Sequence, residues 1–203
     1  MPALFISFEG IDGAGKSTHI GRLQQHLAGQ GLDVCLTREP GGTPLGESVR
    51  GWVLHQPVDP VTETLLMFAA RAEHLARVIR PALAAGRIVL CDRFTDATRA
   101  YQGAGRGVDR GLLDALAERV EAGTRPALTV LFDVPPAVSK ARLEGIKMPD
   151  RFEREQLEFF ARVREGYLDL ARAEPERMVV VDASRPMQAV TDAVIEAVEA
   201  RLP

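Results

Sequence analysis

The sequence predicts an α/β fold in which a five-stranded parallel sheet is covered by helices on both faces. Two observations lead to this fold class. Short apolar runs without polar alternation are typical of strands that are buried on both faces of a sheet. Longer helical patterns separate these runs, and such alternation of strand and helix is typical of parallel α/β proteins. The 203 residues suffice to bury the core of a single domain, residues 1–203.

Five short apolar runs are expected to form the strands. They occupy residues 3–9, 34–37, 87–91, 128–132 and 178–181. Helical patterns lie between and after them, at residues 16–30, 60–85, 109–122, 135–143, 153–173 and 186–202. Gly31 ends the first helix, as glycine commonly does. Residues 40–46 and 144–151 show no periodic pattern and are interpreted as loops.

The composition limits the classes of partner. The formal net charge is −3, whereas proteins that bind a nucleic-acid polymer usually carry a basic excess. No apolar run reaches the roughly 18 residues of a membrane span, and the N-terminus lacks the pattern of a secretory signal. Cys35 and Cys91 lie in apolar runs and are interpreted as reduced core thiols. We therefore expect a cytoplasmic protein with small-molecule ligands, and neither a nucleic-acid polymer nor a membrane as partner.

A phosphate-binding motif directly follows the first predicted strand. Residues 10–17 read GIDGAGKS, the P-loop pattern, in the strand–loop–helix context that this motif requires. Glycines let backbone N–H groups turn toward phosphate oxygens, and the following helix directs its positive end at the same anion. Lys16 is expected to reach the β- and γ-phosphates of ATP, and Ser17 to bind Mg²⁺. The predicted ATP-binding residues are Gly10, Ile11, Asp12, Gly13, Ala14, Gly15, Lys16, Ser17 and Thr18.

Residues at the ends of two other strands indicate a site for a second phosphate. In an open parallel sheet, ligands bind beyond the carboxyl ends of the strands. Arg38 follows the second strand, and the third ends in Asp92 and Arg93, where a motor ATPase would carry two acids. A guanine-specific GTPase would carry N-K-x-D, but the sequence contains no asparagine. Two facing anion pockets suit phosphoryl transfer. For Arg50, a solvated ion pair is an equal alternative.

Five stretches of sequence occur in an order and spacing that point to one family. They read EGIDGAGKST (9–18), TREPGGT (37–43), LLMFAAR (65–71), DRFTDATRAYQG (92–103) and DRFE (150–153). In these stretches the chain resembles bacterial thymidylate kinase (dTMP kinase), of the P-loop nucleoside monophosphate kinase family, over nearly its whole length. The resemblance implies the P-loop kinase fold with a short lid at about residues 142–152. It also implies transfer of the γ-phosphate of MgATP to dTMP, giving dTDP and ADP for DNA precursor synthesis.

The resemblance assigns roles around the reacting phosphates. Asp12 should lie near the 3′-hydroxyl of the acceptor sugar, and Glu39 should line the same site. Arg38 and Arg93 should hold the dTMP phosphate, with Arg50 in support. The residues implied for Mg²⁺ are Ser17 and Asp92.

The resemblance also implies how the base and sugar are bound. Phe68 should stack on thymine, and Arg71 should donate to the O4 oxygen of the base. Thr98 and Gln102 should contact the pyrimidine edge, and Tyr101 should occupy the place of a ribose 2′-hydroxyl. In many relatives the stacking phenylalanine lies four residues before the arginine, where this chain has methionine. Positions three and four residues before the arginine share a helix face. Phe68 is therefore the residue expected to stack on the base, and a position in the core is the alternative for it.

The lid differs from the family pattern. Relatives without an arginine in the P-loop are expected to supply a catalytic arginine from the lid, and this P-loop has none. Ile146 and Met148 stand where arginines often occur, which leaves Arg142, Arg151 and Lys147, in that order of preference. A lid cation would stabilise charge in the transition state. The predicted catalytic residues are Lys16, Asp12, Arg93, Arg142 and Arg151.

The resemblance further implies a homodimer, for which residues 60–85 would form the interface helix. Two other functions would also suit a P-loop protein. A related kinase would phosphorylate a deoxynucleoside or another monophosphate. A non-catalytic nucleotide-binding or ATPase module would bind or hydrolyse ATP without an acceptor. The arginine pair Arg38 and Arg93 favours a monophosphate acceptor over both.

Overall fold

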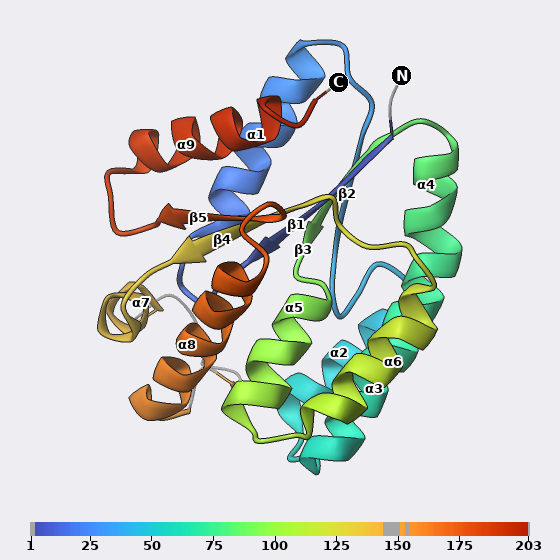
Figure 1. Ribbon diagram of the computed structural model, residues 1–203, viewed down its shortest axis with the longest axis vertical. Coiled ribbons are helices and arrows are strands. Elements are labelled where there is room, and N and C mark those ends of the chain that lie inside the picture. The colour runs from blue at the N-terminus through green and yellow to red at the C-terminus, as the bar shows by residue number, and fades with distance from the viewer. Residues whose placement is uncertain (1–2, 144–150, 153–154, 203) are drawn as a thin grey trace.

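The computed structural model describes residues 3–143, 151–152 and 155–202. Its core is a five-stranded parallel sheet with strand order β2-β3-β1-β4-β5 (Figure 1). This sheet confirms the predicted fold class. The strands are β1 (Leu4–Glu9), β2 (Val34–Arg38), β3 (Ile88–Asp92), β4 (Leu128–Asp133) and β5 (Met178–Asp182).

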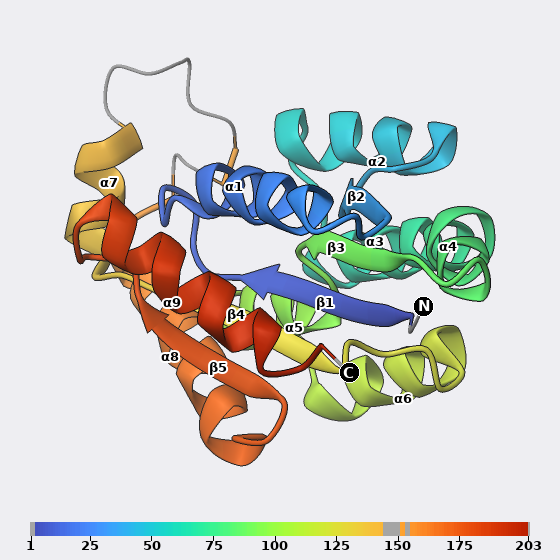
Figure 2. The same ribbon diagram turned by 90° about the horizontal axis from the view of Figure 1, so that it is seen from above.

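Helices cover both faces of the sheet (Figure 2). On one face α1 (Lys16–Gly29) packs against α9 (Met187–Glu199). The other face carries α6 (Arg110–Glu121) and α8 (Leu157–Ala173), with α7 (Pro136–Leu143) between β4 and α8 along the chain. Because β1 and its neighbours are covered on both sides, Ile6, Phe8 and Leu90 have no exposed surface.

The helical stretch predicted at residues 60–85 is one continuous rod of three parts. It consists of α3 (Pro60–His74), a π-helical segment η1 (Leu75–Ile79) and α4 (Arg80–Ala84). Pro81 lies in the first turn of α4. Since proline has no N–H to donate, the wider π-turn directly before it is a local adjustment of the helix.

Two helical segments were not anticipated from the sequence. The first, α2 (Pro44–His55), begins inside the stretch interpreted as a loop. The Thr43 side chain caps it by accepting from the N–H of Gly46 at 3.0 Å, and Pro44 is its first residue, a standard helix start. The second comprises α5 (Thr95–Thr98) and the π-helical segment η2 (Arg99–Gly105). A search of the described helices for a long apolar stretch that could span a bilayer found none.

Candidate active site

The P-loop connects the end of β1 to the start of α1. Gly10 has a φ of 134°, and a Cβ at this position would lie 2.5 Å from the carbonyl oxygen of Phe132. Only glycine therefore fits where the loop crosses β4. The Lys16 side chain folds back under the loop, and its Nζ donates to the carbonyl oxygens of Gly10 at 3.1 Å and Ile11 at 3.2 Å. Burial, followed by the nearby Arg93 charge, lowers the pKa of Lys16.

Most of the residues predicted to bind the two sets of phosphates line one hollow, which we call the P-loop cleft; Gly10, Ile11 and Ala14 are not among them. From the loop and α1 it takes Asp12, Gly13, Gly15, Lys16, Ser17 and Thr18; from the other strand ends and α2 it takes Arg38, Glu39, Arg50, Asp92 and Arg93. Four cations face this cleft: Lys16 and the guanidinium groups of Arg38 at the end of β2, Arg50 on α2 and Arg93 directly after β3. Such a concentration of positive charge is suited to polyphosphate.

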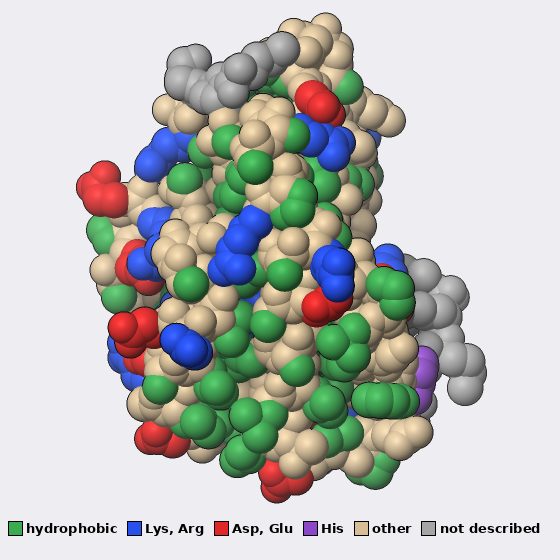
Figure 3. All heavy atoms as spheres, turned by 90° about the vertical axis from the view of Figure 1, so that its right-hand side faces the viewer, with side chains coloured by type: hydrophobic (Ala, Val, Ile, Leu, Met, Phe, Trp, Pro, Cys, Tyr) green, Lys and Arg blue, Asp and Glu red, His purple; other side chains and the backbone are tan. Residues whose placement is uncertain are grey.

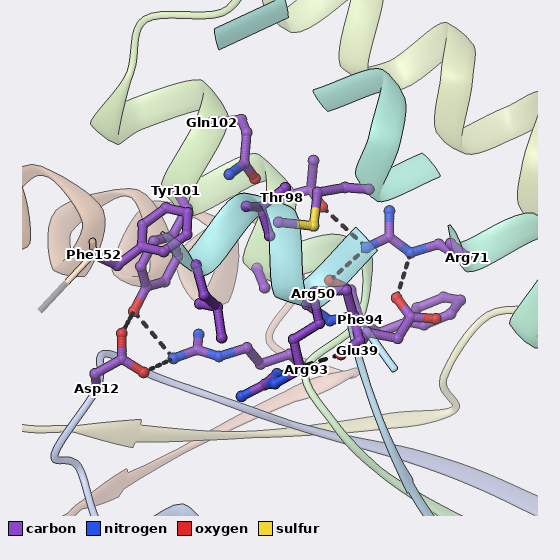
Figure 4. A pocket seen from close by; sticks show the side chains of 15 residues that line it. Asp12, Glu39, Arg50, Arg71, Arg93, Phe94, Thr98, Tyr101, Gln102 and Phe152 are labelled. Atoms are coloured by element: carbon purple, nitrogen blue, oxygen red, sulfur yellow. Dashed lines mark hydrogen bonds and ion pairs between the residues drawn. The ribbon is translucent and has the colours of Figure 1, made fainter. Parts of the chain in front are cut away.

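Arg93 is the most closely held of these cations. Its Nη2 donates to Asp12 Oδ1 at 2.7 Å and to the Tyr101 hydroxyl at 3.1 Å, and its Nη1 donates to the Tyr167 hydroxyl at 3.2 Å. Tyr101 in turn donates to Asp12 Oδ2 at 3.1 Å, as Figure 4 shows. Although burial acts to raise the pKa of Asp12, the charges of Arg93 and Lys16 hold it below its ordinary value.

The backbone of Arg93 is itself unusual. Its φ of 71° lies in the left-handed region, which costs a non-glycine residue free energy and is typical of functional sites. This conformation follows directly after β3 and turns the side chain back across the cleft toward the P-loop.

Arg38 and Arg50 complete the arginine set in different ways. Arg38 is half-exposed and its Nη2 donates to both carboxylate oxygens of Glu47, at 3.1 and 2.9 Å. Arg50 donates to the carbonyl oxygen of Pro40 at 3.3 Å. Burial, then the charges of Arg38 and Arg93, lowers the pKa of Arg50. A set of cations that repel one another is relieved by binding an anion between them.

The residues implied for Mg²⁺ fit a metal that also binds substrate phosphates. Asp92 Oδ1 is buried, and no hydrogen-bond partner for it occurs in the part of the chain that is described. Ser17 and Asp92 line the same cleft. Within the described residues no group of three acidic, histidine or cysteine side chains could hold a metal alone. Mg²⁺ in kinases commonly takes one or two protein oxygens and completes its shell with water and phosphate.

A second hollow, the α3 pocket, opens beside the P-loop cleft and encloses about 660 Å³, including the part open to solvent. Its walls are largely apolar, and its polar groups include Arg71, Thr98 and Gln102 (Figure 4). This combination is typical of a site for a flat organic ring. The apolar wall residues are Pro40, Val53, Leu54, Met67, Phe94, Ala97 and Phe152.

Arg71 is the polar centre of the α3 pocket. It is 2% exposed, and its Nε donates to Glu39 Oε2 at 2.7 Å. Its Nη2 donates to the carbonyl oxygen of Phe94 at 3.2 Å and to Thr98 Oγ1 at 3.0 Å. Its Nη1 is buried and has no partner within the described residues. An unsatisfied buried guanidinium nitrogen is costly, so this donor is suited to an acceptor atom on a ligand.

The structure places Phe68 differently from the sequence prediction. Its ring is 2% exposed and packs with Val108, Leu113 and Ala117, whereas Met67 lines the pocket. Each residue along a helix turns the side chain by about 100°, and that step separates the two positions. The alternative of a core position therefore describes Phe68, and Met67 takes its place in the wall of the pocket.

Conservative variants separate these two roles. Phe68→Leu is expected to lower the free energy of unfolding by about 1 kcal/mol through imperfect repacking, with no change in the KM for dTMP, the acceptor that the resemblance implies. Met67→Ala removes part of the pocket wall and is expected to raise that KM about tenfold. Steady-state kinetics and urea unfolding of both variants would check this. The reverse pattern, with Phe68→Leu alone changing KM, would contradict the placement.

The predicted lid arginines have other partners. Arg151 donates through Nε to the carbonyl oxygen of Val53 at 2.9 Å, and its Nη2 contacts Glu63. Glu63 is fully buried and also accepts from Gln102 Nε2 at 2.6 Å. These contacts place Arg151 behind the wall of the α3 pocket rather than over the P-loop, where the predicted catalytic role would require it.

Arg142, on α7, donates through Nη2 to the carbonyl oxygen of Ala183, just after β5, at 2.9 Å. It therefore lies near the end of β5 and is absent from the lining of the P-loop cleft. The third candidate, Lys147, and most of the predicted lid fall on residues 144–150, outside the described residues.

Sequence reasoning missed Glu9, the last residue of β1. Its carboxyl is fully buried, accepts from the N–H of Phe94 at 2.7 Å and lies 2.9 Å from the Tyr167 hydroxyl. Burial, followed by the charge of Asp96, raises the pKa of Glu9 from 4.5 to about 8. A carboxylic acid at the carboxyl end of a buried strand was the available signal.

The raised pKa of Glu9 makes the stability of the fold depend on pH. The folded state binds the proton more tightly, so the stabilisation is complete below pH 4.5 and is lost as the pH rises to about 8. Over that range, the free energy of unfolding should fall by at most about 1.4 kcal/mol per pH unit. Urea unfolding at several pH values should show this slope in the natural protein and lose it in Glu9→Gln. The exposed Glu118→Gln variant should keep it, and an unchanged slope in Glu9→Gln would contradict the assignment.

Comparisons with known proteins point to one family. Residues 8–194 match the family model described as thymidylate kinase. A thymidylate kinase of Burkholderia thailandensis is 57% identical over 187 residues, which cover 90% of this chain and 91% of that protein. One of Methylobacillus flagellatus is 54% identical over 196 residues and covers 97% of each. The crystal structure of thymidylate kinase from Ehrlichia chaffeensis matches with a TM-score of 0.81 at 36% identity, covering 98% of this chain and 100% of that one.

Proposed function

The chain belongs to the thymidylate kinase family, and from that premise we propose how its residues transfer the γ-phosphate of ATP to dTMP, giving dTDP and ADP. One observation carries the proposal. Asp12, Glu39, Arg50 and Arg93 line both the P-loop cleft and the α3 pocket. A nucleotide whose base lies in the α3 pocket would therefore present its phosphate to the P-loop. The two substrates would meet head-on, without a covalent enzyme intermediate.

The donor side of the site is the P-loop. Its backbone N–H groups and Lys16 would bind the ATP phosphates, with the positive end of α1 directed at them. Ser17 and Asp92 would hold Mg²⁺, which supplies charge neutralisation on the phosphates when bound. Arg142 and the residues after β5, 183–185, would lie on the side of the cleft that receives adenine.

The acceptor side combines residues that bind the phosphate of dTMP with residues that recognise its base. Arg93 and Arg50, with Arg38 released from Glu47, would bind the dTMP phosphate. The Arg71 Nη1 donor would meet O4 of thymine, with Met67 and Phe94 along the face of the ring. Tyr101 stands between Asp12 and the pocket wall, where a 2′-hydroxyl would have to displace it. A cytosine, which places a donor where thymine has O4, would leave Arg71 unsatisfied and be rejected.

A coupled assay of ADP release tests the proposal directly. With MgATP and dTMP, turnover should be fast, and without an acceptor only slow hydrolysis should remain. A panel of thymidine, dUMP, dCMP and dTMP separates the monophosphate kinase from a deoxynucleoside kinase. Preference for thymidine over dTMP, or a rate of ATP hydrolysis that does not depend on the acceptor, would overturn the proposed function.

We also propose a cytoplasmic location, which is consistent with the free cysteines Cys35 and Cys91.

We further propose that two copies of the chain pair through α2 and α3. Leu65, on α3, is 48% exposed, and Trp52, on α2, is 50% exposed. From Leu65 the outer face of the rod continues through exposed Ala69, Ala72 and Ala76, which would let two helices approach closely. Exposed hydrophobic side chains gather on this side of the molecule (Figure 3). Such a patch is typical of an interface. Sedimentation should show that the natural protein is a dimer and that Leu65→Glu dissociates it. Val180→Glu, at an exposed position of β5, should leave the dimer intact. A monomeric natural protein would contradict the proposed pairing.

A further inference from the structure

A hydrogen-bonded chain of four side chains runs behind the α3 pocket. Thr37 Oγ1 lies 2.6 Å from His74 Nε2. His74 Nδ1 lies 2.8 Å from Glu39 Oε1, and Glu39 Oε2 accepts from Arg71 Nε at 2.7 Å. The side chains of His74, Glu39 and Arg71 are 1%, 5% and 2% exposed. The chain thus connects the end of β2 to the polar centre of the pocket.

The direction of each hydrogen bond follows from the chemistry of the groups. A carboxylate oxygen only accepts, so His74 Nδ1 must donate to Glu39. In the neutral imidazole, Nε2 is then the acceptor, and the Thr37 hydroxyl donates to it. Each carboxylate oxygen of Glu39 therefore has one partner on α3, His74 on one side and Arg71 on the other.

The surrounding backbone closes over the outer end of this chain. Gly42 has a φ of 74°, and a Cβ there would lie 2.7 Å from both His74 Nε2 and Thr37 Oγ1. The loop after β2 is thus packed directly on the histidine and the threonine. So little space remains at this point that the histidine has little freedom to take another rotamer.

We infer that His74, held by Thr37, is a positioning residue that sets the direction in which Arg71 presents its Nη1 donor to the acceptor base. Glu39 orients Arg71 through Nε, and His74 is the group that prevents the Glu39 carboxylate from rotating. His74 lies three residues beyond Arg71, outside the five stretches that resemble the family. It lines neither the α3 pocket nor the P-loop cleft. The inference rests on the proposed role of Arg71 in base recognition.

Three substitutions test the inference. His74→Phe keeps the ring but removes both nitrogens, and is expected to raise the KM for dTMP about tenfold with little change in kcat. It should also lower the preference for dTMP over dCMP by a similar factor, because Arg71 no longer points in one direction. His74→Asn places an amide N–H near the position of Nδ1 and should recover most of the affinity. Thr37→Val, which removes only the hydroxyl, should show a smaller effect in the same direction.

Controls separate this inference from a role in packing alone. A structural defect would lower the melting temperature and disturb the KM for ATP as well, with no recovery in His74→Asn. An unchanged KM for dTMP in folded His74→Phe would overturn the inference. Should His74→Phe fail to fold, an unchanged dTMP preference in Thr37→Val would overturn it instead. Arg71→Met belongs to the same series: if it too leaves the KM and preference unchanged, the acceptor assignment itself fails.

Discussion

Replacing Lys16 with alanine is expected to lower kcat by about 10³-fold or more while the fold remains intact. The Nζ of Lys16 is the one cation that originates within the P-loop motif itself, and it faces the cleft from beneath the loop. Its ammonium group would compensate negative charge that develops on the transferred phosphate. Its two hydrogen bonds to Gly10 and Ile11 are local to the loop, so their loss should not unfold the sheet.

The measurement for Lys16→Ala is single-turnover kinetics at saturating ATP and dTMP, beside circular dichroism for the fold. Lys140, an exposed lysine on α7, supplies the matched control: Lys140→Ala should retain the natural rate. Turnover by Lys16→Ala at the natural rate would contradict the assignment of the P-loop as the site that binds the ATP phosphates.

The second large effect is expected for Arg93→Met, which should lower kcat/KM for dTMP by about 10³-fold. Arg93 belongs to both hollows and is the cation closest to Asp12. Methionine keeps much of the side-chain volume but removes the charge and all three hydrogen bonds. The Asp12 carboxylate would lose the neighbour that most lowers its pKa. The acid limb of the rate profile should therefore move to higher pH in this variant.

Kinetics of Arg93→Met at several pH values, with Arg110→Met as control, would check this prediction. Arg110 is 88% exposed and pairs only with Asp114 among the described residues, so its loss should leave the rate unchanged. The variant Arg93→Gly would relieve the left-handed backbone while losing the same charge. It should match Arg93→Met in rate and exceed it in stability. Equal kcat/KM in Arg93→Met and the natural protein would show that the acceptor phosphate binds elsewhere.

Lys16 and Arg93 differ in how much of their position follows from local sequence. Lys16 is identifiable from a local motif, since strand, loop and helix start follow one another in the chain. Arg93 was expected to face the P-loop because strand ends meet at one edge of a parallel sheet. Its left-handed backbone and its contacts with Tyr101 and Tyr167 depend on the tertiary structure, which brings η2 and α8 to the end of β3.

The sequence by itself determined the sheet, its helical layers and the position of the phosphate cradle. These depend on hydrophobic periodicity and on short motifs, which are local. It did not distinguish Phe68 from Met67, because neighbouring positions at the edge of a helix face differ only once the helix is rotated against its neighbours. The tertiary structure also gave Arg151 its partners and joined His74 and Arg71 to Glu39. A buried polar group needs a hydrogen-bond partner, and here the partners lie far apart in the chain, where no local pattern can indicate them.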